Sequence, residues 1–305
     1  MTTLFRFSDI PNQDGRTALV TGANTGIGFE IARHLAKRGA RVLMGCRNEG
    51  RAREAMRRIE REYGEANLAF VALDLADMDS IRAAADKVKE EDRLDILINN
   101  AGRIATKVEP AIGRAEMQFA VNHLGPFALT GLLLDKLSQD GGGRVIAQAS
   151  IAHRSAQMDF DNLDGSKGYD PIAAYRRSKL ANLLFMFELD RRLRFANSSV
   201  VSLASHPGIA VSELARDFGW ANKLSRFVAG FFNSAEDGAL PALQAATDPN
   251  AEGGEYFGPY GLREMRGKMS GPAIVARRAR DPGTARHLWE RSEELTGVSY
   301  DLPPP

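Results

Sequence analysis

The sequence has little that would indicate disulfide chemistry, insertion into a membrane or binding to a polyanion. Its 305 residues include one cysteine, Cys46, which excludes an intrachain disulfide and a cysteine metal cluster. Apolar runs such as 183–187 are far too short to span a bilayer, and the first 15 residues lack a signal peptide's apolar core. The formal net charge is +1, so no excess of basic residues indicates a nucleic-acid partner. These absences predict a soluble, cytoplasmic protein with no integral membrane association.

Apolar runs typical of β-strands alternate with helical patterns along the chain. The expected strands are 17–20, 41–44, 68–73, 95–98, 144–149 and 199–205, and the expected helices are 26–38, 48–63, 80–90, 114–138 and 173–195. This alternation predicts an α/β fold, a doubly wound (Rossmann) parallel sheet of about seven strands flanked by helices. No repeat or low-complexity linker divides residues 1–305, so we expect a single domain. The stretch from about 261 is less regular, with a helix expected at 281–296.

A cluster of glycines follows the first expected strand and opens the first expected helix. The spacing is G-x-x-x-G-x-G, which differs from the G-x-G-x-x-G of the dinucleotide fingerprint. A helix N-terminus offers free N–H groups to a phosphate, and glycine lets the backbone approach a pyrophosphate. The alternative is a tight turn without a ligand. On the first interpretation the cofactor-binding residues of the turn are Gly22, Asn24, Thr25, Gly26, Ile27 and Gly28.

The end of the second expected strand indicates which dinucleotide is bound. NAD-binding units usually place an acidic residue there, to bond the ribose 2′-hydroxyl. Here the sequence is RVLMGCRN, and Arg47 stands in that place. A guanidinium suits a 2′-phosphate, so NADP (NADPH over NADH) is the expected cofactor, with Arg51 sharing the role. A solvated arginine at a helix entry is the alternative.

A second group of residues suits proton transfer. Tyr175 and Lys179 are four residues apart and project from the same helix face, where an ammonium favours the phenolate and lowers the phenol's pKa. Ser150 ends an apolar run, where its hydroxyl can donate to a carbonyl oxygen or simply cap a turn. The sequence LINNAG ends the fourth strand in a polar turn, which is either an ordinary loop or a wall against the cofactor.

Taken together, these motifs resemble the short-chain dehydrogenase/reductase family. The matching elements are TGANTGIG at 21–28, Asp74-Leu75, NNAG at 99–102, Asn122, Ser150, Tyr175 with Lys179, and Pro207-Gly208. They occur in the family's order over roughly residues 15–257. The segments YRRSKLANLLF, ASIAH and SHPGIAVSEL are most similar to the retinol-dehydrogenase-like and WW-domain-oxidoreductase-like branch of the family. That branch acts on lipophilic alcohols and carbonyls, mostly with NADP.

The resemblance implies roles for these residues. Tyr175 would donate or accept the proton, Lys179 would lower its pKa and hold the nicotinamide ribose, and Ser150 would position the substrate oxygen. Asn122 would support a water that links Lys179 to solvent; otherwise it only kinks a helix. The remaining cofactor contacts implied are Asp74, Leu75, Asn100, Ala101, Gly102, Pro207, Gly208, Ile209 and Ser212.

The segment of about 208–234 is expected to cover the substrate. It is rich in large apolar side chains: Phe218, Trp220, Leu224, Phe227, Val228, Phe231 and Phe232. Apolar pockets favour a bulky hydrophobic alcohol or carbonyl compound, although a core, a subunit contact or a membrane surface would use the same residues. The apolar face of 180–193 indicates burial against a second helix. Since the family often pairs such helices between subunits, a homodimer or homotetramer is expected.

These observations predict an NADP-dependent oxidoreductase that interconverts a hydrophobic alcohol and its ketone or aldehyde. A non-catalytic dinucleotide sensor or scaffold on the same fold is the alternative from another class, and a protochlorophyllide-reductase-like enzyme is the alternative among enzymes. The histidines His123, His153 and His206 have no metal-ligand spacing, so we expect them to pack or cap, and we expect no metal site.

Overall fold

The computed structural model describes residues 4–139, 142–209 and 233–304. Their strands are β1 (Thr17–Thr21), β2 (Arg41–Cys46), β3 (Leu68–Ala72), β4 (Ile96–Asn99), β5 (Arg144–Gln148), β6 (Val201–Ser205), β7 (Tyr256–Pro259) and β8 (Ser270–Pro272). They form one sheet in the order β3-β2-β1-β4-β5-β6-β7-β8. β1 to β7 pair in parallel, and the order reverses at β1 and β4, which is the doubly wound arrangement that the sequence predicts.

The expectation of about seven parallel strands is corrected at the edge of the sheet. An eighth strand, β8, pairs antiparallel with β7, and Ser270 in it bridges to Phe5 near the N-terminus. β8 has only three residues and ends in Pro272, so it shows no apolar run in the sequence. The six strands expected from the sequence are all present, with ends that differ by one or two residues.

The described α-helices begin, with two exceptions, at side-chain caps that the sequence supplies. They are α1 (Gly26–Lys37), α2 (Glu49–Tyr63), α3 (Met78–Lys89), α4 (Met117–Phe119), α5 (Gly125–Ser138), α6 (Pro171–Phe195), α8 (Ala235–Thr247) and α9 (Pro282–Thr296). The side chain of Asp170 accepts from the Ile172 N–H at the start of α6, and Asp281 accepts from the Thr284 N–H at the start of α9. The helix expected at 281–296 is therefore confirmed.

The long helix expected at 114–138 is wrong at its start. Arg114 has a left-handed backbone, with φ of 66°, and the helical stretch begins only at α4. Between α4 and α5 the chain forms a π-helical turn, Ala120–Leu124. A π-turn inserts extra backbone into a helix, so it reorients the side chains within it, here including Asn122.

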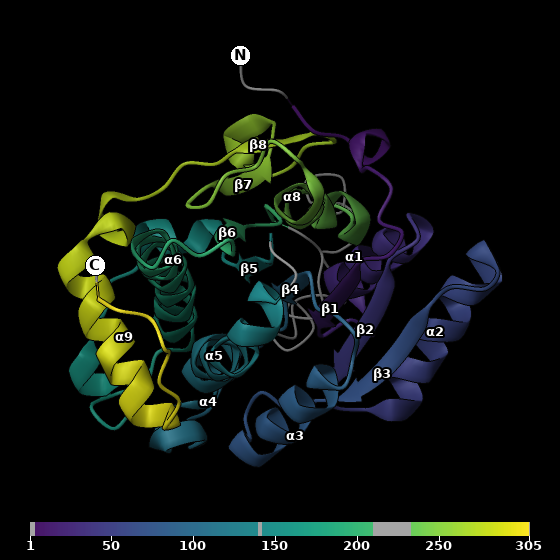
Figure 1. Cartoon of the computed structure of the whole chain (residues 1–305). Helices are drawn as coiled ribbons and strands as arrows, with labels where there is room; N and C mark the ends of the chain where they lie inside the picture. The colour runs from purple at the N-terminus through teal and green to yellow at the C-terminus, as the bar shows by residue number, and fades with distance from the viewer. Residues whose placement is uncertain (1–3, 140–141, 210–232, 305) are drawn as a thin grey trace.

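Helices cover both faces of the sheet (Figure 1). Alternate residues of the central strands pack into two cores, one on each face. Ala18 and Val20 of β1 face the core formed with α1, α2 and α8. Leu19 faces the core formed with α3, α5, α6 and α9. Because both faces are buried, the strands read as continuous apolar runs.

The apolar face of α6 is covered by α9 of the same chain, which lies beside it at the outer edge of the molecule (Figure 1). Trp289 of α9 is 2% exposed; its ring packs against Phe127 and Phe185, and the Arg192 guanidinium lies 4.3 Å from it. The second helix expected from the sequence is thus found within the chain, and this face no longer indicates a dimer. In the part of the chain that is described, no helix is both long and apolar enough to cross a membrane.

Candidate active site

Larger side chains do not suit the glycine turn between β1 and α1, at Gly22 and Gly26 because of the backbone conformation and at Gly28 because of close contacts. Gly22 and Gly26 have φ of 69° and 56°, a backbone region that favours glycine. A Cβ at Gly28 would lie 2.3 Å from the Gly22 carbonyl oxygen and 2.5 Å from Asn100 Nδ2. The turn therefore brings backbone closer to backbone than any side chain allows.

The start of α1 has the features of a phosphate site. Thr25 is the residue before the helix, in extended conformation, and its side chain makes no capping hydrogen bond. The N–H groups of the first turn are consequently left without a side-chain acceptor from the cap. Asn24, Thr25 and Ile27 are half-buried at this opening. These residues fit a dinucleotide pyrophosphate.

The sequence LINNAG, at the end of β4, is hydrogen-bonded to the glycine turn. Asn100 Nδ2 donates to the Thr21 carbonyl over 2.8 Å, and the Ala101 N–H donates to Thr21 Oγ1 over 3.0 Å. Asn99 points away from the turn and donates to Thr130 in α5. The residues of the NNAG segment therefore have different surroundings: Asn100 and Ala101 contact the glycine turn, whereas Asn99 belongs to the core.

Three further expected cofactor contacts, Arg47, Asp74 and Leu75, follow β2 and β3. Arg47 follows β2 and is exposed at the carboxyl edge of the sheet, beside the glycine turn that follows β1. Asp74 is half-buried after β3 and accepts from the Ala76 N–H, which fixes the turn, and Leu75 is buried beside Gly125. Burial raises the pKa of the neighbouring Cys46 thiol to about 11, so this cysteine stays protonated and unreactive near neutral pH.

Tyr175 and Lys179 lie one turn apart on α6, with the ammonium nitrogen 5.7 Å from the centroid of the phenol ring. Lys179 is 4% exposed, and its Nζ donates to the Gln148 carbonyl over 3.0 Å. Asn182 Nδ2 donates to the same carbonyl, also over 3.0 Å. The spacing in the sequence thus places the lysine between the tyrosine and the end of β5.

The surroundings shift the pKa values of both groups. Burial lowers the pKa of Lys179 to about 8. Burial also raises the pKa of Tyr175, and a hydrogen bond with Ser150 opposes that rise, so the lowered phenol pKa expected from Lys179 is not found. Ser150 is buried, and its Oγ also accepts from the Ala152 N–H over 3.2 Å at the start of the 3-10 turn Ile151–Ser155. Ser150 is therefore the turn cap, one of the two roles that the sequence allows, and it is also a hydrogen-bond partner of the phenol.

Asn122 lies at the centre of the π-helical turn and is fully buried. Its Nδ2 donates to Ser178 Oγ and to the Arg103 carbonyl, and its Oδ1 accepts from the Arg103 N–H over 2.8 Å. A Cβ placed on Gly102 would lie 3.3 Å from Asn122 Oδ1 and 3.4 Å from Lys179 Nζ. The structure thus brings Gly102, Asn122 and Lys179 to one point.

The loop after β6 is held by a segment that follows β7. The Ile209 N–H donates to the Met265 carbonyl over 2.8 Å, and Asn233 Nδ2 donates to the Pro207 carbonyl. Gly208 has φ of 72°, and a Cβ there would lie 2.3 Å from the Met265 oxygen. Sequence reasoning missed Met265 because no pattern links it to a loop 56 residues earlier. Ser212 and the apolar residues from Phe218 to Phe232 lie outside the described residues.

The expected packing and capping roles of the histidines are found. His123 packs among aromatic rings and contacts Ser292, and burial lowers its pKa to about 3. His153 Nδ1 lies 2.6 Å from the Ser150 carbonyl oxygen, and His206 Nδ1 accepts from the Gly208 N–H. These bonds show how the loops after β5 and β6 are fixed.

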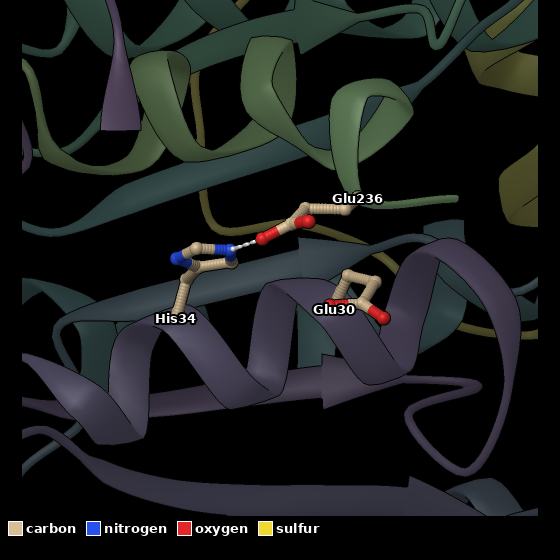
Figure 2. Close-up of side chains that lie close together, drawn as sticks. All are labelled: Glu30, His34 and Glu236. Atoms are coloured by element: carbon tan, nitrogen blue, oxygen red, sulfur yellow. Dashed lines mark hydrogen bonds and ion pairs between the residues drawn. The ribbon is translucent and has the colours of Figure 1, made fainter. Parts of the chain in front are cut away.

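One group of side chains outside this site has the composition of a metal centre. Atoms of Glu30, His34 and Glu236 that could bind a metal lie within 4.8 Å of one another, and Figure 2 shows them between α1 and the start of α8. Arg33 donates to Glu30 over 2.7 Å and to Glu236 over 2.6 Å. His34 also stacks on Phe7. Because Arg33 pairs with both carboxylates, we interpret this group as an ion-pair cluster that joins the two helices.

Comparison with known proteins agrees with this geometry. The family model described as short chain dehydrogenase matches residues 16–219. Mouse retinol dehydrogenase 12 is 40% identical over 290 residues, covering 94% of this chain and 88% of the relative; mouse retinol dehydrogenase 13 is 42% identical over 295 residues, covering 93% and 85%.

Solved structures give the same result. An uncharacterized protein from Mycobacterium paratuberculosis superposes with a TM-score of 0.82 at 36% identity, covering 98% of this chain and 100% of that one. L-sorbose reductase from Gluconobacter frateurii, complexed with NADPH and L-sorbose, gives 0.63 at 25% identity, covering 81% and 95%.

Proposed function

Because the chain belongs to the short-chain dehydrogenase family, in its retinol-dehydrogenase-like branch, we propose that it is an NADP-dependent oxidoreductase of hydrophobic alcohols and carbonyls. Membership of this family establishes the general activity, which is the interconversion of CH–OH and C=O groups with a nicotinamide dinucleotide. The convergence of Tyr175, Ser150 and Lys179 at the carboxyl end of β5 is the observation that carries the proposal.

The residues at the carboxyl edge of the sheet fit the dinucleotide. We infer that the glycine turn and the uncapped start of α1 hold the pyrophosphate, and that Gly102 and Lys179 lie at the nicotinamide end. Arg47, exposed at the end of β2, would bind the 2′-phosphate that distinguishes NADP from NAD. When bound, the nicotinamide supplies or accepts the hydride.

The side chains of the chain itself handle the proton. In reduction, the Tyr175 phenol gives its proton to the substrate oxygen while the Ser150 hydroxyl donates a hydrogen bond to that oxygen. The Lys179 ammonium stabilises the phenolate that forms, and Asn122 would support a water that links Lys179 to solvent. In oxidation the same proton moves in the opposite direction.

The proposed substrate class follows from the relatives and from the sequence. Retinol dehydrogenases act, by their name, on a largely apolar alcohol, and residues 218–232 carry many large apolar side chains. The cytoplasmic location and the homo-oligomer stay predictions, and size-exclusion chromatography with light scattering would test the second.

The test is a spectrophotometric assay of the purified protein with NADPH or NADH and a panel of hydrophobic aldehydes and ketones. We expect turnover that prefers NADPH. Tyr175→Phe should lower kcat by roughly 10²- to 10⁴-fold, as expected for loss of a general acid, while leaving NADPH affinity nearly unchanged. Binding of NADPH without turnover on any substrate would instead favour the non-catalytic sensor.

A further inference from the structure

Three segments that are distant in the sequence meet at the carboxylate of Glu264. Its Oε2 lies 3.1 Å from His206 Nε2 and also accepts from the Arg154 guanidinium. Its Oε1 accepts from the Ile274 N–H over 3.0 Å. The carboxylate thus links the turn after β5, the loop after β6 and the segment after β8 to the connection between β7 and β8, which carries Glu264 itself.

The protonation of His206 is fixed by its other ring nitrogen. Nδ1 accepts from the Gly208 N–H over 3.1 Å, so in the neutral ring the proton lies on Nε2 and points at Glu264. His206 is fully buried, and this burial lowers its pKa, which keeps the ring neutral. The histidine therefore transmits a directed hydrogen bond from the carboxylate to the backbone of the loop after β6.

The cluster lies directly behind the candidate active site. Arg154 belongs to the same 3-10 turn that Ser150 caps, and Met265, next to Glu264, accepts from the Ile209 N–H. Burial raises the pKa of Tyr256 well above its usual value, and Arg154, Glu264 and Tyr175 also act on that phenol.

The backbone around Glu264 also depends on these contacts. Arg263 and Glu264 have φ of 51° and 57°, both in the left-handed region that side chains other than glycine rarely adopt. Such a conformation persists only where the surrounding interactions hold it. The hydrogen bonds of the Glu264 carboxylate are among these interactions, together with the backbone bonds from the Glu264 N–H to Gly261 and from the Met265 N–H to Leu262.

We propose that Glu264 is a positioning residue, which fixes the Ser150 turn and the Pro207–Ile209 loop relative to each other through Arg154 and His206. The inference rests on the proposed function, because it assigns Ser150 to the substrate oxygen and the Pro207–Ile209 loop to the nicotinamide. Glu264 itself touches neither substrate nor cofactor.

The first test compares three variants. Glu264→Gln removes the charge, Glu264→Asp keeps it, and Glu294→Gln is the matched control, since Glu294 pairs with Arg291 on the exposed side of α9. We expect Glu264→Gln to lower kcat/KM by about tenfold or more and to raise the KM for NADPH, because a displacement near 1 Å at a reacting centre costs up to about 100-fold. Glu264→Asp should recover part of the loss. Unchanged kinetics with only a lower melting temperature would overturn the proposal.

A double-mutant cycle tests the route through Arg154. If Arg154 and Glu264 act as one unit, Arg154→Met should add little to the loss already caused by Glu264→Gln. Losses in kcat/KM that simply multiply would mean that the two residues act independently, against the proposal.

A measurement that does not depend on turnover separates this inference from the proposed function. Amide hydrogen exchange should be faster at 150–156 and 206–209 in Glu264→Gln than in Glu294→Gln. If the wild-type protein turns over no substrate, but exchange is faster in Glu264→Gln than in Glu294→Gln, the proposed function fails and the positioning role stands. If exchange is unchanged while the wild type is active, the positioning role fails and the proposed function stands.

Discussion

Replacing Lys179 by methionine is expected to stabilise the protein while abolishing its activity. The ammonium is 4% exposed, and burial lowers its pKa from the ordinary 10.5 to about 8. At about 1.4 kcal/mol per pKa unit, holding the charge in the folded state costs about 3 kcal/mol at pH 7. Methionine fills a similar volume without a charge.

The replacement loses the hydrogen bond from Lys179 to the Gln148 carbonyl. That carbonyl keeps the Asn182 donor at 3.0 Å, so it is not left without a partner, and the loss is about 1 kcal/mol. The net effect is a gain of about 2 kcal/mol in the free energy of unfolding at pH 7. Urea denaturation of wild type and variant measures it, with the exposed Lys89→Met as control.

The pH dependence gives the sharper check. Between about pH 8 and 10.5 the unfolded lysine binds a proton that the folded one has lost, so wild-type stability rises with pH over this range. By pH 9.5 the penalty falls by about 2 kcal/mol, and the advantage of the variant should nearly vanish. The reasoning would be refuted if the variant were less stable than wild type at pH 7. It would also be refuted if the variant exceeded wild type by the same free energy of unfolding at pH 7 and pH 9.5.

Three further predictions concern other parts of the molecule. Gly28→Ala should abolish NADPH binding in a fluorescence titration, because its Cβ would lie 2.3 Å from the Gly22 oxygen; intact affinity would contradict the close approach. Arg47→Asp should weaken NADPH binding by about 1.5–3 kcal/mol and favour NADH; an unchanged cofactor preference would remove the proposed role. Trp289→Ala should lower the free energy of unfolding by about 3–5 kcal/mol, measured in urea; a loss under 1 kcal/mol would show that α9 is not held by this ring.

The arrangement of the sheet could be predicted from the sequence because its signals are local. Continuous apolar runs marked the six strands, and helical periodicity marked the segments between them. The edge strand β8 gave no such signal, since its three residues gain their strand geometry only by pairing with β7. The start of the helix expected at 114–138 is also wrong, because no local sequence pattern reveals the left-handed backbone of Arg114.

In the candidate site, too, the features that depend on local sequence could be predicted, and the contacts between distant segments could not. The glycine turn and the pair Tyr175 and Lys179 could be found from spacing alone, because a turn and a helix face are defined within a few residues. The hydrogen bond of Ser150 to the phenol and the approach of Gly102 to Lys179 join residues from different strands, and spacing does not contain them.

The sequence by itself therefore determined six of the strands, most of the helices between them, the glycine turn and the identity of the proton-transfer pair, but not α8, β7 or β8. Only the tertiary structure decided that α9 covers α6, that Arg33 pairs with the carboxylates beside His34, and that Glu264 contacts the Ser150 turn through Arg154. The physical reason is the range of the interactions. Backbone hydrogen bonding and helical periodicity act over a few residues, whereas burial, ion pairing and pKa shifts depend on which distant segments the fold brings together.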